Sequence, residues 1–307
     1  MRNYLFAQFA AYVRNWYIFA MNPTAHHIIS LRRGLDASSL VNDNPCSGVS
    51  ALGSYWSGYG DTDTQSRLVR FFKDNAAEGS RSPYFMPVAS TYADMIARIA
   101  SVFRPSALVR VLASSETMPD HSRPLAALAD MVCMRLNIPD FTHLFFRSEK
   151  RKPMSQIDIL SGAGALRRRI EYVKQDVFIR EHSLGGRVLL IDDICNLKAT
   201  ARVYSAALKS FCGVEYVSAV YLAAARFNNG KDGWGYLSLD LDEFARAAKS
   251  SSAAPEVRLG LEDVWLAPRE QVFHSVPNCR LASPDCRQSF RFLAEQTRSL
   301  CSACAAG

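Results

Sequence analysis

The sequence predicts an α/β protein in which a parallel sheet is flanked by helices, with a small metal-binding module near its C-terminal end. The first observation is Val188–Ile191, an uninterrupted apolar run that suits a strand buried on both faces. The second is that similar runs at about 107–112, 141–146 and 216–224 are separated by stretches with helical spacing. The third is that four of the eight cysteines fall within the last thirty residues, which favours metal binding over disulfides. We therefore expect four parallel strands and a separate metal site.

Composition limits the class of protein. A chain of 307 residues, 49% of them hydrophobic, can form one large domain or two smaller ones with a substantial core. The formal net charge of +7 favours an anionic ligand without requiring nucleic acid. No stretch is long and apolar enough to span a membrane. Because no secretory signal accompanies the cysteines, we expect a cytoplasmic protein in a reducing compartment.

We divide the chain into three parts. Residues 1–65 hold an N-terminal helix, with apolar residues spaced by four and three, and a loop region over 34–63 that is rich in Gly, Ser, Asn and Asp. Residues 66–249 form the main domain, and residues 256–307 the C-terminal module. Within the main domain we expect a short strand over Tyr84–Val88 and helices over Ser66–Asn75, Thr91–Val102 and Arg123–Leu136.

The stretch from Gly186 to Thr200 organises the main domain. Asp192 and Asp193 follow the apolar strand, and ligands of open α/β sheets bind at the carboxyl ends of the strands. A short loop comes next, and Thr200 can cap the helix that follows. Carboxylates can accept from hydroxyls or hold Mg²⁺, while loop amides and a helix N-terminus attract phosphate. The pattern therefore predicts a site for a sugar phosphate.

This stretch resembles the signature of type I phosphoribosyltransferases, in which a hydrophobic strand, two acids and two spacers precede Thr-Thr-Gly-x-Thr. Val188–Cys195 and Thr200 match that signature. The resemblance implies that Asp192 and Asp193 bind the ribose hydroxyls of phosphoribosyl pyrophosphate, in the presence of Mg²⁺. It also implies that the loop binds the 5′-phosphate, through residues drawn from Asn196, Lys198, Ala199 and Thr200.

The middle of the loop departs from the family pattern. Asn196, Leu197 and Lys198 stand where Thr, Thr and Gly are usual. Leu197 lacks a hydroxyl donor, which is worth roughly 0.5–1.5 kcal/mol net. A residue with a Cβ costs roughly 1–2 kcal/mol in the left-handed conformation, so at Lys198 the loop either accepts this strain or takes another shape. We expect weakened ligand binding and slow or absent turnover.

A basic region precedes the signature strand. The layout of Arg147, Lys152, Gln156, Leu160, Arg167–Arg169 and Phe178 resembles the ComF-like branch of the phosphoribosyltransferase family. That branch accompanies DNA uptake or plasmid-linked functions. In the family a mobile hood here closes over the pyrophosphate, and its cations stabilise charge on the leaving group. A solvated basic loop is the alternative interpretation.

The tail carries a candidate zinc site. Cys301 and Cys304 have the CxxC spacing of a zinc knuckle, and His274 and Cys279 can complete a set of three thiolates and one imidazole. Cys286 is the competing ligand for His274 or Cys279.

The surroundings of these ligands resemble a small treble-clef or Ada-type metal module. Phe290, Leu293 and Leu300 predict a helix over residues 289–300 that would deliver the CxxC pair. A module this short has little core, so structural Zn²⁺ would supply much of its folding energy. Unrelated thiols in a frayed tail are the alternative.

Three functions remain open on sequence grounds. In the first, the protein is a phosphoribosyltransferase-like binder of a ribose 5-phosphate-type ligand, such as phosphoribosyl pyrophosphate or a nucleotide, with weak or absent catalysis. In the second, it is an active Mg²⁺-dependent phosphoribosyltransferase. In the third, it is a zinc-containing nucleic-acid accessory protein of the DNA-uptake or plasmid-linked type, and the C-terminal module is a candidate contact for a nucleic acid or a protein partner.

Overall fold

The computed structural model describes residues 27–56, 63–75, 82–157, 164–226, 244–245, 262–267, 270–295 and 297–306. The predicted N-terminal helix lies outside these ranges, as do residues 158–163 within the basic region. Among the described residues, no helix is long and apolar enough to cross a membrane.

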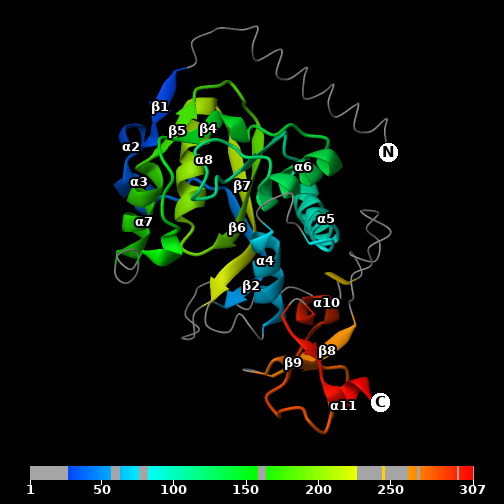
Figure 1. The fold of residues 1–307 in the computed structure, drawn as a ribbon. Coiled ribbons are helices and arrows are strands. Elements are labelled where there is room, and N and C mark those ends of the chain that lie inside the picture. Colours follow the sequence, from blue (N-terminus) through cyan, green and yellow to red (C-terminus); the bar gives the residue numbers. More distant parts are fainter. Residues whose placement is uncertain are drawn as a thin grey trace.

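A four-stranded parallel sheet forms the centre of the molecule (Figure 1). Its order is β2 (Gly48–Trp56), β7 (Tyr216–Arg226), β6 (Arg187–Cys195) and β3 (Ala107–Arg110). Every neighbouring pair of strands is parallel. The predicted fold class and the strands near 107–112, 187–191 and 216–224 are therefore confirmed.

Both faces of the sheet are covered, as an uninterrupted apolar strand requires. On β6, Val188 and Leu190 belong to one buried cluster, whereas Leu189 and Ile191 belong to another. The helices of the first face are α3 (Ala37–Asn42), α7 (Ala165–Lys174) and α8 (Ala199–Cys212). Those of the second face are α4 (Thr64–Asp74), α5 (Phe85–Phe103) and α6 (Pro124–Leu136). Figure 1 shows these two helical layers.

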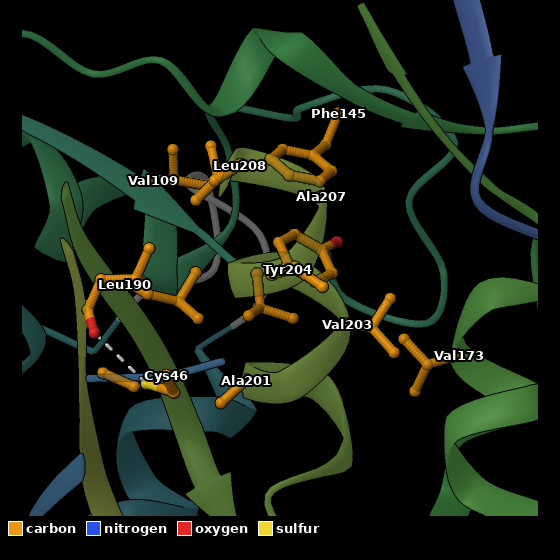
Figure 2. Packing of buried hydrophobic residues seen from close by; sticks show 14 of the residues in the cluster. Cys46, Val109, Phe145, Val173, Leu190, Ala201, Val203, Tyr204, Ala207 and Leu208 are labelled. Atoms are coloured by element: carbon orange, nitrogen blue, oxygen red, sulfur yellow. Dashed lines mark hydrogen bonds between the residues drawn. The ribbon is translucent and has the colours of Figure 1, made fainter. Parts of the chain in front are cut away.

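A small antiparallel sheet completes the first face. Its order is β1 (Ile28–Ser30), β5 (Val177–Arg180) and β4 (Phe145–Arg147), and the short helix α2 (Leu31–Gly34) follows β1. Single 3₁₀ turns lie at Thr142–Leu144 and Met154–Gln156. The ring of Phe145 stacks on Tyr204 of α8 with centroids 4.3 Å apart, and Figure 2 shows both within the packed core. The small sheet is thereby fixed to the central one.

Three local predictions outside the C-terminal module are wrong. The 141–146 run is no strand of the central sheet, because after a single parallel bridge from Asp140 to Leu108 the chain enters a 3₁₀ turn and then β4. Part of the expected 34–63 loop is instead the strand β2, whose small residues pack closely: a Cβ at Gly48 would lie 3.2 Å from Ser218 Oγ. The expected strand at Tyr84–Val88 is the start of α5, where the first turn tolerates Pro87.

The C-terminal module is a second four-stranded sheet with two short helices. Its sheet order is β10 (Arg287–Phe290), β8 (Asp263–Leu266), β9 (Val272–His274) and β11 (Ser299–Leu300). The helices are α10 (Arg291–Ala294) and α11 (Ser302–Ala305). The single helix expected over residues 289–300 is wrong, because pairing of β10 with β8 and of β11 with β9 competes with it.

The module packs against α4, as Figure 1 shows. Thr64 donates its hydroxyl proton to the Gln288 carbonyl over 2.7 Å, and Arg67 donates to the carbonyl of Leu293. The Phe292 ring meets Phe71 edge-on, with centroids 5.7 Å apart. Phe290, Phe292 and Leu293 lie in the same buried cluster as α4 and α5. The module and the main domain therefore share a hydrophobic core.

Candidate functional site

Asp192 and Asp193 lie at the carboxyl end of the central sheet, on a strand that continues to Cys195. The backbone of Asp192 pairs with Tyr221 of β7. Successive side chains of a strand point to opposite faces, so the two carboxylates diverge. Asp193 meets Lys73 of α4. Alternation along β6 puts Asp192 on the same face as Val188 and Leu190, which α8 covers. The sequence predicted the position of the pair but not this divergence.

The Asp193 carboxylate already has a cationic partner. Lys73 Nζ, in the last turn of α4, lies 2.6 Å from Asp193 Oδ2. Burial alone would lower the pKa of Lys73, but the charge and hydrogen bond of Asp193 outweigh it, and the pKa is raised. The two side chains remain 40% and 31% exposed, so the pair contributes about 0–1 kcal/mol to stability. Nothing in the sequence places Lys73 beside Asp193.

The Asp192 carboxyl group holds its proton unusually strongly. Burial raises its pKa to about 8, and the neighbouring charge of Asp193 adds to the shift. One opposing contact is the hydrogen bond from the backbone N–H of Asp193 to Asp192 Oδ1, at 2.9 Å. A carboxyl with such a pKa is mostly protonated at neutral pH.

The loop after β6 turns sharply into α8. Lys198 is the N-cap residue and has the left-handed backbone angles φ 60° and ψ 14°, with no side-chain capping hydrogen bond. Of the two alternatives at this residue, the loop therefore accepts the strain. Leu197 is exposed, whereas Ala199 and Thr200 are buried in the first turn of the helix. Asn196 is partly buried between β6 and this turn.

A second loop, at Ala113–Glu116, follows the neighbouring strand β3 and is fixed by hydrogen bonds to buried side chains. The buried Arg110 guanidinium makes two hydrogen bonds to Glu116, of 2.9 and 2.7 Å. Glu116 also accepts from the backbone N–H groups of Ala113 and Asp120. Arg147, from β4, donates to the carbonyls of Leu112 and Ala113. Sequence reasoning missed Arg110, since a charged residue at the end of an apolar strand has no local signal.

These parts together can bind a polar, negatively charged ligand. Two carboxylates at the sheet edge can accept hydroxyl protons or share a divalent cation. The N-terminus of α8, a helix of 14 residues, carries partial positive charge beside them. The structure brings Asp192, Asp193 and the Asn196–Thr200 turn into one continuous segment at this edge.

The second candidate site is in the C-terminal module. One potential ligand atom from each of His274, Cys279, Cys301 and Cys304 lies within 4.8 Å of every other. His274 ends β9, and its neighbour Phe273 accepts a hydrogen bond from the Cys301 backbone at 2.9 Å, across the β9–β11 pairing. A turn supplies Cys279, and α11 supplies Cys304. The four residues that the sequence singled out are thus brought together, and Cys286 is not among them.

Hydrogen-bond donors favour the thiolate forms of Cys301 and Cys304. The N–H groups of Cys304 and Ala303 lower the pKa of Cys301. Burial opposes ionisation of Cys304, but hydrogen bonds from the backbone and side chain of Ser275 contribute most to lowering its pKa, to about 6. A thiolate is the form of cysteine that binds a metal.

Comparison with solved structures finds adenine phosphoribosyltransferases from two Leishmania species. The Leishmania tarentolae protein is 14% identical, with a TM-score of 0.30 over 53% of this chain and 88% of that chain. The Leishmania donovani protein is also 14% identical, with a TM-score of 0.25 over 61% of this chain and 92% of that one. No protein-family model and no curated protein matches the sequence. The fold class therefore rests on the parallel sheet and its flanking helices.

Proposed function

We propose that this protein binds a ribose 5-phosphate-type ligand, such as phosphoribosyl pyrophosphate or a nucleotide, and that it transfers the phosphoribosyl group slowly or not at all. The observation that carries the proposal is the acidic pair Asp192–Asp193, followed within one turn by a left-handed Lys198 at the start of α8. This order places hydroxyl acceptors and a phosphate-attracting helix end at the same edge of the sheet.

The phosphate would bind at the first turn of α8. Backbone N–H groups of Ala199 and Thr200 belong to the unpaired donors at a helix N-terminus. Lys198 puts a cation where the helix dipole disfavours one, and a bound dianion would relieve that conflict. The ammonium group of Lys198 can thereby replace part of the phosphate binding that the altered loop has lost.

The ribose would bind through the carboxylates, with Mg²⁺ as their counter-ion. Two features support weak rather than tight binding. Lys73 forms an ion pair with Asp193 and must be displaced before that carboxylate can bind a ligand. Asp192 must lose its proton, which its raised pKa disfavours, before it can bind a cation. Leu197 adds a third weakness, since it offers no hydroxyl donor to the phosphate.

Titration calorimetry with Mg²⁺ and phosphoribosyl pyrophosphate, ribose 5-phosphate or a nucleoside monophosphate tests the proposal. We expect saturable binding of at least one of these ligands that is weakened tenfold or more in Asp192→Asn. A matched control is Asp43→Asn, which changes an exposed carboxyl group remote in sequence from the acidic pair. No binding of any phosphorylated ribose, or equal loss in both variants, contradicts the proposal. Tight binding of short DNA alone would favour the nucleic-acid alternative.

A double variant distinguishes a degenerate phosphate loop from a working one. In the double variant Leu197→Thr with Lys198→Gly, tighter binding than in the wild type supports a degenerate loop. Loss of binding there would show that Lys198 is a working phosphate ligand, and would favour the active enzyme.

Lys73→Met should tighten ligand binding about two- to fivefold, because the exposed ion pair between Lys73 and Asp193, worth about 1 kcal/mol or less, no longer competes with the ligand for Asp193.

A further inference from the structure

We propose that His274, Cys279, Cys301 and Cys304 bind one structural zinc ion, that Nδ1 of His274 is its nitrogen ligand, and that Glu270 holds the imidazole in place. The proposal is independent of the ligand at the sheet edge. It concerns a different module, different residues and a different chemistry.

The spacing of the sulfurs fits a shared ion. Cys279 Sγ and Cys301 Sγ are 3.8 Å apart, and neither residue is in a disulfide. A disulfide would require about 2.05 Å. Tetrahedral zinc with S–Zn distances of about 2.3 Å separates two sulfurs by about 3.8 Å. The observed separation is therefore that of two ligands on one tetrahedral ion.

His274 is arranged as a metal ligand with an outer carboxylate. Its side chain is fully buried, and Nε2 lies 3.2 Å from Glu270 Oε2. Nδ1 is buried and has no hydrogen-bond partner among the described residues. When Nε2–H donates to the carboxylate, the neutral ring presents a lone pair at Nδ1. One ring nitrogen of His274 lies within 4.8 Å of the sulfur of each of the three cysteines. Zinc-bound histidines commonly donate their second N–H to a carboxylate in this way.

The chemistry of the ligand set selects zinc. Three thiolates and one imidazole are soft to borderline ligands, and they form closed tetrahedral sites without an open position for substrate. The ion would therefore be structural. Calcium and magnesium, which require oxygen ligands, do not suit this cluster.

The part of the module that carries the four ligands has only a small core of its own, apart from the α10 residues that pack against α4. Its own buried cluster consists of Val264, Leu266, Phe273 and Ala294, with Leu300 packed against it. The β9–β11 pairing that joins His274 to the CxxC segment extends over two residue pairs. A core of this size cannot by itself offset the conformational entropy of the ordered segment, whereas metal binding contributes folding free energy directly.

The test is metal analysis of the purified full-length chain, followed by cobalt substitution. We expect close to one zinc per chain, and a tetrahedral Co²⁺ spectrum with thiolate-to-cobalt charge transfer. Cys301→Ser should lose the metal, whereas the control Cys286→Ser should retain it, since Cys286 stands outside the cluster. Glu270→Gln should weaken zinc in chelator competition by about 10- to 100-fold while the ion remains tetrahedral.

Several results would overturn the proposal, and they do not depend on whether Cys301→Ser folds. One is metal-free protein that binds no Co²⁺, or protein with a Cys279–Cys301 disulfide under reducing purification. Another is loss of zinc from Cys286→Ser, or iron in place of zinc. Unchanged zinc affinity in Glu270→Gln would remove the assigned role of Glu270 and with it the assignment of Nδ1.

Discussion

At the scale of single residues, Lys198 bears backbone strain. Its φ of 60° costs a residue with a Cβ roughly 1–2 kcal/mol, and glycine avoids that cost while losing about 0.5–1 kcal/mol in unfolded-state entropy. We therefore expect Lys198→Gly to raise the free energy of unfolding by about 0.5–1 kcal/mol in urea denaturation. Lys209→Gly, inside α8, is the matched control and should cost about 1 kcal/mol. Destabilisation of equal size at both positions would contradict the strain argument.

Asp192 predicts how stability depends on pH. The unfolded carboxyl ionises near its ordinary pKa of 3.8, whereas the folded one keeps its proton to about pH 8. Between these values the folded state binds more protons, so the free energy of unfolding should fall as pH rises from about 4 to 8. Asp192→Asn should flatten this part of the profile, measured by urea denaturation across that range, while Asp43→Asn should not. Parallel profiles for the wild type and Asp192→Asn would refute the assignment.

At the scale of elements, the packing of α10 against α4 joins the C-terminal module to the main domain. Phe292 is fully buried and contacts the rings of Phe71 and Tyr84. Phe292→Ala should lower the free energy of unfolding by about 3–5 kcal/mol, measured in urea, because it leaves a cavity in the shared core. The control Leu281→Ala removes a side chain that is 55% exposed and should cost less than about 0.5 kcal/mol. Similar costs for both would mean that the two parts do not share a core.

At the scale of the whole molecule, the shared core links the proposed zinc site to the stability of the central domain. In a module that folded independently, loss of Cys301 would loosen the tail and leave the main domain intact. Since Phe290, Phe292 and Leu293 fill the core beside α4, a loosened module would withdraw them from it. Removing zinc should therefore lower the free energy of unfolding by several kcal/mol. Because each kcal/mol corresponds to a shift of about 2–4 °C, the melting temperature should fall by about 10 °C.

Differential scanning calorimetry with and without a zinc chelator measures this effect. We expect one cooperative transition that shifts as a whole, and Cys286→Ser should respond to chelation as the wild type does. A small early transition, followed by an unshifted main one, would show that the module unfolds independently.

Local pattern determined the features that depend on neighbours in sequence. The apolar run Val188–Ile191 predicted a buried parallel strand, and its carboxyl end placed Asp192 and Asp193 at the sheet edge. The spacing of Cys301 and Cys304, with His274 and Cys279 before them, named the four residues that the fold brings together. Periodicity and ligand spacing are short-range signals, so they can be recognised in the sequence without knowledge of the fold.

Tertiary structure decided what depends on distant segments. Pairing with β7 makes a strand of the small residues in Gly48–Trp56, and pairing between β-strands divides the expected helix at 289–300. Only the packing of α4 on the sheet brings Lys73 to Asp193, and only the fold buries His274 beside the three cysteines. These contacts arise from burial and strand pairing between segments far apart in the chain, and no local pattern of residue types encodes them.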